Sequence, residues 1–291
     1  MNNILVFFLI SLFMFSCKPD AIELNVPQAP GKIAVASQQV EGGFLVLTLS
    51  RTFSALSDKR ATLSDSIRPL PEELLVKGAF VQLTRDGGQI TLTEMSPGVY
   101  ATEQLTPVDY ANYTLQVTDA EKGHTLSSQT VMLPQVRFDT VGVVRNPQKE
   151  TEYTIHYAFT DLPGMGNWYV VNYYTKDNRR DSLPRNPADV DYIAKRMLEQ
   201  RLDYDLISES DIQGGQYSIT KNFTNNKLDT FAVALSNISQ GYYEFLKAQK
   251  KYNTLVNQIR GEVVNLPTNI SNGYGYFNLH TPHVKAIDLS K

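Results

Sequence analysis

The sequence contains very little cysteine. Cys17 is the only cysteine among 291 residues, so the chain has no disulfide framework, no cysteine-based metal site and no second thiol to act as a nucleophile. The 27 basic residues nearly balance the 30 acidic ones, which gives a net charge of −3. Nucleic-acid binding favours a basic surface, and we therefore expect no nucleic acid among the partners.

The signatures of common enzyme classes are also missing. The sequence has no Gly-x-Ser-x-Gly elbow, no Gly-x-x-x-x-Gly-Lys-Ser/Thr phosphate loop and no His-Glu-x-x-His motif. We therefore predict no catalytic residues, no cofactor and no enzyme activity. Carboxylates that are distant in sequence could still pair as an acid and a base, which leaves a hydrolase of unknown type as the third alternative.

Two local clusters contain residue types that bind metals. His280 and His283 flank Thr281 and Pro282; proline breaks the helix that would put both rings on one face, and a zinc site needs further ligands. We expect a polar loop there. The acidic run consists of Asp203, Asp205, Glu209 and Asp211. It lacks the ligand spacing and central glycine of a calcium-binding loop, so we predict a solvated helix end and no metal.

What the sequence does have is a short apolar segment at its N-terminus. Residues 4–15 carry no charge; the run is too short for a membrane-spanning helix of roughly 20 residues but suits the apolar core of a signal peptide, about 7–15 residues long. Ser16 and Cys17 follow, where lipoprotein processing would cut and attach lipid. We predict a lipoprotein signal over 1–17 with lipid on Cys17. The alternative is a buried segment with a chance cysteine.

The next segments predict a tether and a β-sandwich. Residues 18–31 contain three prolines, which stiffen a linker. Over 32–134 short alternating segments are separated by turn residues, including Asp86-Gly87-Gly88, a strong hairpin signal. About seven such strands predict an immunoglobulin-like β-sandwich.

The remaining residues, 135–291, predict a second β-rich domain. Alternating strands are interrupted by two stretches with helical spacing, near 187–202 and 242–259. The second of these is followed by Gly261, which suits the end of a helix. We therefore predict a mainly β protein: an immunoglobulin-like sandwich followed by an antiparallel β domain with one or two packed helices.

Aromatic residues of the second domain are the candidate contacts for a ligand or partner. Successive side chains of a strand point to opposite faces, so one aromatic strand places rings on both faces. Rings with polar tips suit wet interfaces. The candidates are Trp168, Tyr169, Tyr173, Tyr174, Tyr274 and Tyr276. Ordinary packing of a sheet against a helix is the alternative.

Several landmarks occur in an order that resembles a known family. They are Cys17 with its proline-containing tether, Ser96-Pro-Gly-Val-Tyr100, Tyr113-x-Leu-x-Val117 followed by Gly123, Asp161-Leu-Pro-Gly-Met-Gly-Asn-Trp-Tyr169, Ile238-Ser-Gln-Gly-Tyr-Tyr-Glu-Phe-Leu246 and Asn265-Leu-Pro-Thr-Asn-Ile-Ser-Asn-Gly-Tyr-Gly-Tyr-Phe277. The sequence is similar to the Bacteroidota lipoprotein family catalogued as domain of unknown function 4249. This resemblance implies an outer-membrane lipoprotein, often encoded beside TonB-dependent receptors, and implies no catalytic residues.

We therefore expect a protein held in the outer membrane through its N-terminal lipid, on either the periplasmic or the cell-surface face. Its expected role is that of a binding or accessory module, with a TonB-dependent outer-membrane receptor as the partner in nutrient uptake. The alternative is a structural or adhesive surface lipoprotein without a small ligand. A binding role predicts exposed aromatic rings in the second domain, whereas a structural role predicts buried ones.

Overall fold

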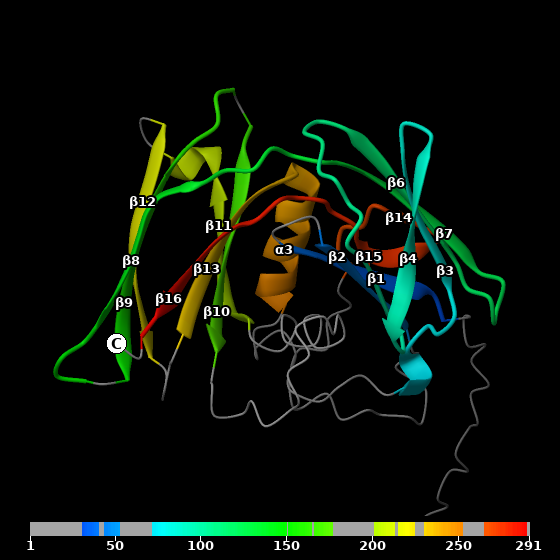
Figure 1. Ribbon diagram of the computed structural model, residues 1–291, viewed down its shortest axis with the longest axis horizontal. Helices are drawn as coiled ribbons and strands as arrows, with labels where there is room; N and C mark the ends of the chain where they lie inside the picture. The colour runs from blue at the N-terminus through cyan, green and yellow to red at the C-terminus, as the bar shows by residue number, and fades with distance from the viewer. Residues whose placement is uncertain are drawn as a thin grey trace, which may run out of the picture. The chain divides into compact units, whose positions relative to one another are not determined.

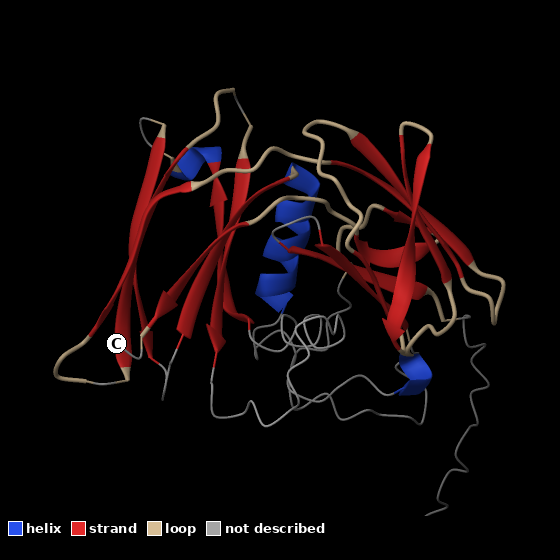
Figure 2. Cartoon of the chain, viewed as in Figure 1, coloured by secondary structure: helices blue, strands red, loops and turns tan. Residues whose placement is uncertain are grey.

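The computed structural model describes residues 31–40, 44–52, 72–149, 151–164, 166–176, 201–212, 215–224, 230–252 and 265–289. These residues form strands β1 to β16, short 3-10 turns, and one α-helix, α3 (Gln240–Tyr252). Figure 2 shows how strongly strands dominate. The predicted mainly β fold is confirmed. Cys17 and the segments 1–17 and 18–30 lie outside the described residues.

A nine-stranded sheet contains most of the first half of the chain. Its strands are, in pairing order, β14 (Ile270–Ser271), β7 (Thr125–Val131), β6 (Asn112–Thr118), β3 (Phe80–Arg85), β4 (Gly88–Ser96), β5 (Val99–Thr102), β2 (Phe44–Arg51), β1 (Ile33–Val40) and β15 (Gly273–Tyr276). Strand β4 pairs with β3 along its first half and with β5 along its second. The sheet thereby folds over on itself into the two layers of a sandwich, called here the first sandwich.

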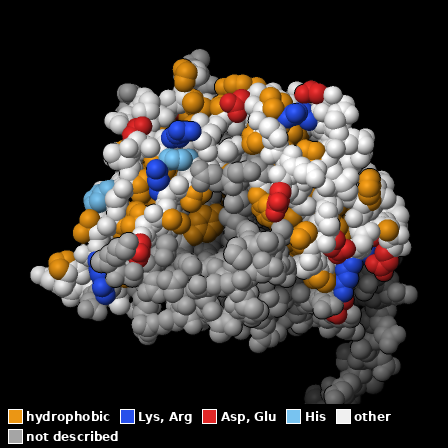
Figure 3. Space-filling view, in the orientation of Figure 1, with side chains coloured by type: hydrophobic (Ala, Val, Ile, Leu, Met, Phe, Trp, Pro, Cys, Tyr) orange, Lys and Arg blue, Asp and Glu red, His pale blue; other side chains and the backbone are white. Residues whose placement is uncertain are grey.

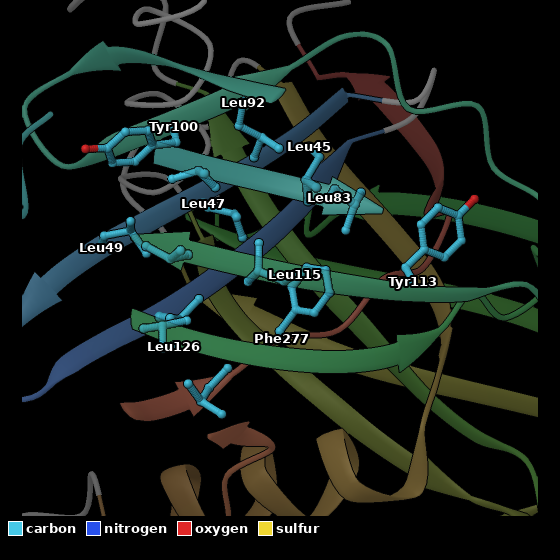
Figure 4. Close-up of a cluster of buried hydrophobic side chains, with 14 of the residues drawn as sticks. Leu45, Leu47, Leu49, Leu83, Leu92, Tyr100, Tyr113, Leu115, Leu126 and Phe277 are labelled. Carbon is cyan, nitrogen blue, oxygen red and sulfur yellow. The ribbon is translucent and has the colours of Figure 1, made fainter. Parts of the chain in front are cut away.

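The core of the first sandwich follows from the alternation of side chains along its strands. Leu45, Leu47 and Leu49 of β2 are fully buried, because every second side chain of a strand points to the same face. They pack against Leu83 of β3 and Leu115 of β6 in the opposite layer (Figure 4). This is the alternation that predicted a sandwich over residues 32–134.

Tyr113 pins the turn that precedes β6. Its ring is buried and its hydroxyl donates to the carbonyl oxygen of Thr106 at 3.2 Å, while Arg85 donates to the same carbonyl at 2.9 Å. A buried tyrosine that bonds back to the backbone a few residues upstream is the tyrosine corner of immunoglobulin-like sandwiches. The corner accounts for the pattern Tyr113-x-Leu115-x-Val117, one of the landmarks of the sequence.

The second half of the chain forms another sandwich from two separate sheets, called here the second sandwich. One sheet has the order β11 (Arg201–Ser208), β10 (Trp168–Lys176), β13 (Thr230–Ile238) and β16 (His283–Asp288), and the other β12 (Gln216–Thr224), β9 (Glu152–Thr160) and β8 (Phe138–Arg145). A largely aromatic core lies between them. All pairs within these sheets are antiparallel.

Helix α3 packs on the outer face of the four-stranded sheet. Its buried residues Tyr243 and Leu246 contact Val170 and Ile238, which point away from the aromatic core. Ser239 accepts a hydrogen bond from the backbone of Tyr242 at 3.3 Å, which supplies the N-terminal cap that a helix start needs. The helix predicted at 242–259 therefore begins at Gln240, and its residues after Tyr252 lie outside the described part.

The connection between β13 and β16 leaves the second sandwich and extends the first. After α3 the chain forms β14, which pairs with β7, and β15, which runs parallel to β1; Figure 1 shows these late segments beside early strands. Glycine is required at this contact, because Gly275 has φ +92° and an added Cβ would overlap the carbonyl oxygen of Val35. The chain then returns to the second sandwich as β16. On the way, His280 forms an isolated parallel β-bridge with Leu133.

The helix predicted near 187–202 falls mostly outside the described residues, and its last two positions, 201 and 202, begin strand β11. The division into domains 32–134 and 135–291 stays a prediction. Strands β14 and β15 nevertheless pair with strands of the first segment, and Ile270 and Phe277 belong to the core of the first sandwich.

Candidate functional site

Strand β10 places its aromatic rings on both faces, as the sequence predicted. Tyr169 and Tyr173 point into the second sandwich, where both are fully buried. The Tyr169 ring meets Phe159 edge-on with centroids 4.9 Å apart, and the Tyr173 ring lies 4.9 Å from Phe223. These two tyrosines fill the core, and in this structure neither offers a surface to a ligand.

The hydroxyls of the two buried tyrosines bond to carboxylates at the edge of the core. Tyr169 donates to Asp161, and Tyr173 donates to Asp205. Burial, together with the neighbouring carboxylates, raises the pKa of both phenols well above the ordinary value. Both rings are therefore neutral hydrogen-bond donors at physiological pH and do not act as bases.

Trp168 and Tyr174 point to the other face of β10, the face that α3 covers. Trp168 is partly buried and packs against the cluster formed by Val170, Tyr204 and the helix. Tyr174 is also partly buried. Each ring keeps some exposure, which the core tyrosines do not.

Three aromatic side chains from two distant segments meet where α3 approaches β15. Tyr242 and Phe245 stack with centroids 6.0 Å apart, and Tyr276 lies 5.5 Å from the first ring and 5.6 Å from the second. All three are partly exposed. We call them the α3–β15 cluster. Hydrophobic side chains gather near the centre of the face seen in Figure 3.

The backbone around the α3–β15 cluster is held by polar contacts. Asn278 accepts a hydrogen bond from Ser239 at 3.0 Å, and its backbone amide donates to Ser37 at 3.1 Å. At Gly241 an added Cβ would overlap the Tyr276 hydroxyl, so any larger residue would have to displace the Tyr276 ring. The two C-terminal landmark segments therefore meet here, and both serve to join α3 to the first sandwich.

Tyr274 lies apart from the cluster and is the most exposed of the predicted site residues. It keeps 46% of its surface accessible. Lys32 places its ammonium nitrogen 5.2 Å from the centre of the Tyr274 ring, within the range of a cation–π contact. The register of β15 against β1 pairs Tyr274 with Ala34, so the ring stands on the outer face of the sheet.

The acidic run was predicted to be a solvated helix end, and this is wrong for Asp203 and Asp205. Both lie in strand β11, where Lys221 of β12 bonds to them at 3.0 and 2.7 Å. Burial alone would lower the pKa of Lys221, but these two hydrogen bonds outweigh it and raise the pKa. Lys221 and the two aspartates therefore form ion pairs between β11 and β12, the edge strands of the two sheets. Its sequence signal was the alternation of the two aspartates with Tyr204 and Leu206.

Each of the two histidines near the C-terminus has a structural contact, so the predicted polar loop is only partly right. His280 is 8% exposed, and its Nδ1 accepts from the Asn278 side-chain amide at 3.0 Å. Burial lowers the pKa of His280 to about 4. His283 uses Nδ1 to accept the backbone amide of Phe138 at 3.0 Å. Among the described residues no group of three His, Cys, Asp or Glu side chains is placed to hold a metal.

The comparisons with known proteins give a family and little else. The family model described as "Domain of unknown function (DUF4249)" matches residues 20–286, and no curated protein matches the chain. Among solved structures, a two-domain fibronectin type-III segment of chicken tenascin is similar at 8% identity, covering 89% of this chain and 99% of that one with a TM-score of 0.22. A likeness with so low a TM-score carries no argument, and the assignment of the fold therefore rests on the strand pairing. In the described part of the chain, no helix has the length and apolar character needed to cross a membrane.

Proposed function

Because this chain belongs to the family of the domain of unknown function (DUF4249), we propose that it is an outer-membrane lipoprotein anchored through Cys17 and acting as a binding or accessory module. Its partner is a TonB-dependent outer-membrane receptor, and its task is nutrient uptake. The anchor is supported by the uncharged run 4–15 directly before Ser16 and Cys17.

The observation that carries the binding role is the α3–β15 cluster. Tyr242, Phe245 and Tyr276 are partly exposed and in mutual contact. Tyr169 and Tyr173, in contrast, are fully buried in the core. Aromatic rings held rigidly at a surface are the usual anchors of binding energy in protein interfaces. Helix packing and the Ser239–Asn278 hydrogen bond fix these rings in place, which lowers the entropy lost on binding.

A structural or adhesive surface lipoprotein is the second candidate. The full burial of Tyr169 and Tyr173 is what a structural role predicts for those rings. The binding role and the structural role make different predictions for the α3–β15 cluster. A binding module contacts its partner through this surface, whereas a structural lipoprotein has no partner there.

The anchor is tested by cell fractionation. In the wild-type protein the chain should pellet with membranes and carry lipid on Cys17. Cys17→Ala removes the acceptor thiol, so the protein should appear in the soluble fraction. Continued pelleting of Cys17→Ala through an intact N-terminus would contradict the anchor.

The partner is tested by purification from membranes in mild detergent. The wild-type protein should retain a TonB-dependent receptor, identified by mass spectrometry, and the double variant Tyr242→Ser with Phe245→Ser should lose it. The matched control is Tyr110→Ser, which removes a 69% exposed ring far from α3 in the sequence. Retention of no channel protein by the wild type, or equal retention by both variants, would contradict the receptor role of the cluster.

A further inference from the structure

One end of the first sandwich carries two of the exposed aromatic rings. Tyr274 is 46% exposed, and Phe80, the first residue of β3, is 54% exposed. Lys32 lies over the Tyr274 ring. Strand pairing and one ion pair place all three residues at the same end of the sandwich.

Strand β1 starts at Ile33, which pairs with Gly273 next to Tyr274 and with Arg51 at the end of β2. Arg51 bonds to Asp119 at 2.5 Å, and Asp119 directly follows β6. The last residue of β6, Thr118, pairs with Phe80. The start of β1, Tyr274 and Phe80 therefore share one end of the sandwich, called here the β1 end.

The β1 end is also where the chain toward Cys17 leaves the sandwich. Cys17 lies fifteen residues before Lys32 in the sequence, so a lipid on Cys17 keeps this end within about 50 Å of a bilayer, at roughly 3.3–3.6 Å per extended residue. A tether of this length holds the end near the surface at a high effective concentration. Even a weak affinity for the surface is then enough to dock it.

The chemistry of the β1 end fits a lipid headgroup layer. Tyrosine prefers the boundary between apolar and aqueous layers, and a lysine beside it can reach phosphate. Charges at this end are mixed: Lys32 and Lys122 are exposed, while Glu121, 69% exposed, pairs with Arg51 at 2.9 Å. A mixed surface suits zwitterionic lipids, and two rings are too few for a protein interface, which takes about 800 Å² per partner.

Resting on the proposed lipid anchor, we infer that the β1 end docks on the bilayer surface, with Phe80 and Tyr274 at the level of the zwitterionic headgroups and Lys32 toward their phosphates. The anchored protein then stands on this end. The opposite end of the sandwich, which carries Val108, Tyr110 and Val131, faces away from the membrane.

The test uses Cys17 as a chemical handle, because it is the only thiol in the chain. The mature chain, starting at Cys17, is coupled to phosphatidylcholine vesicles that contain a maleimide lipid; the thiolate adds across the maleimide double bond, which takes up a proton. Single variants Phe80→Trp, Tyr274→Trp and Tyr110→Trp each add one fluorophore to Trp168. The readout is the loss of added emission when brominated lipid replaces plain lipid.

Docking predicts that the tryptophans at 80 and 274 are quenched and shift to shorter wavelength, while the tryptophan at 110 is unchanged. No quenching at 80 and 274, or stronger quenching at 110, overturns the inference. Two independent probes keep the test valid if one variant fails to fold. The assay does not depend on natural lipidation, so failure of the anchor, seen by fractionation of Cys17→Ala, is distinguished from failure of docking.

Discussion

The buried His280 makes stability depend on pH in a way that can be calculated. Its Nδ1 accepts a hydrogen bond from the Asn278 side-chain amide, whose oxygen is held by Ser239. A protonated ring would point an N–H at that amide, and burial already disfavours the charge. The pKa of His280 is lowered to about 4 from an ordinary 6.5, so the folded protein binds this proton more weakly than the unfolded chain does.

The sign and size follow from proton linkage. Since the unfolded state binds more protons between pH 6.5 and 4, the free energy of unfolding falls as the pH falls through this window. Through His280 the free energy of unfolding falls by about 2 kcal/mol between pH 7 and pH 5, at 1.36 kcal/mol per pKa unit. The fall from pH 7 reaches about 3 kcal/mol below pH 4.

The assay is urea unfolding of the mature chain at pH 7 and pH 5, comparing the wild type with His280→Asn. Asparagine keeps an acceptor oxygen near the position of Nδ1 but does not titrate. The variant should lose about 2 kcal/mol less than the wild type on acidification. The matched control is His156→Asn, an exposed position on β9, which leaves the buried His280 in place. Equal losses for the wild type and His280→Asn would refute the reasoning.

Two other contacts give predictions that unfolding experiments can check. Arg51→Ala leaves the fully buried Asp119 without its ion pair and should lower the free energy of unfolding by about 3–5 kcal/mol. Glu121→Gln changes an exposed partner of the same arginine and should lower it by at most about 1 kcal/mol. Similar losses for both variants would show that the buried pair is unimportant. Gly275→Ala should cost about 1–3 kcal/mol more than Gly123→Ala, because both glycines have positive φ but only at Gly275 would the new methyl meet backbone, the Val35 carbonyl; equal destabilisation would place the cost in backbone strain alone.

Local patterns predicted the strands and the start of α3 well. The alternation of Leu45, Leu47 and Leu49 is a period-2 signal, and the helical spacing after Tyr242 is a period-3.6 signal; each is set by neighbours in sequence. The aspartates of β11 show how two periods compete. Asp203 and Asp205 have strand spacing, but the preceding residues favoured a helix. The pairing of β11 with β10 decides in favour of the strand, and Lys221 then binds both aspartates.

The candidate site was predictable only in part, for a physical reason. The sequence identified Tyr276 as a candidate but missed its partners Tyr242 and Phe245, which fell within the helix predicted near 242–259. Their contact depends on β15 pairing with β1. Local periodicity carries no information about which strands pair across such a separation. Likewise, the sequence placed rings on both faces of β10 but could not tell that Tyr169 and Tyr173 face the core.

The pairing of β15 with β1 also sets the order in which the protein can fold. Strand β1 pairs with β15, and β7 pairs with β14. During synthesis β1 and β7 are made long before these partners, so one edge of each strand is unpaired until the end of the chain is made. Unpaired strand edges are templates for aggregation, and contacts distant in sequence form slowly. Nascent chains released before residue 276 should therefore depend on chaperones to guard the edges of β1 and β7.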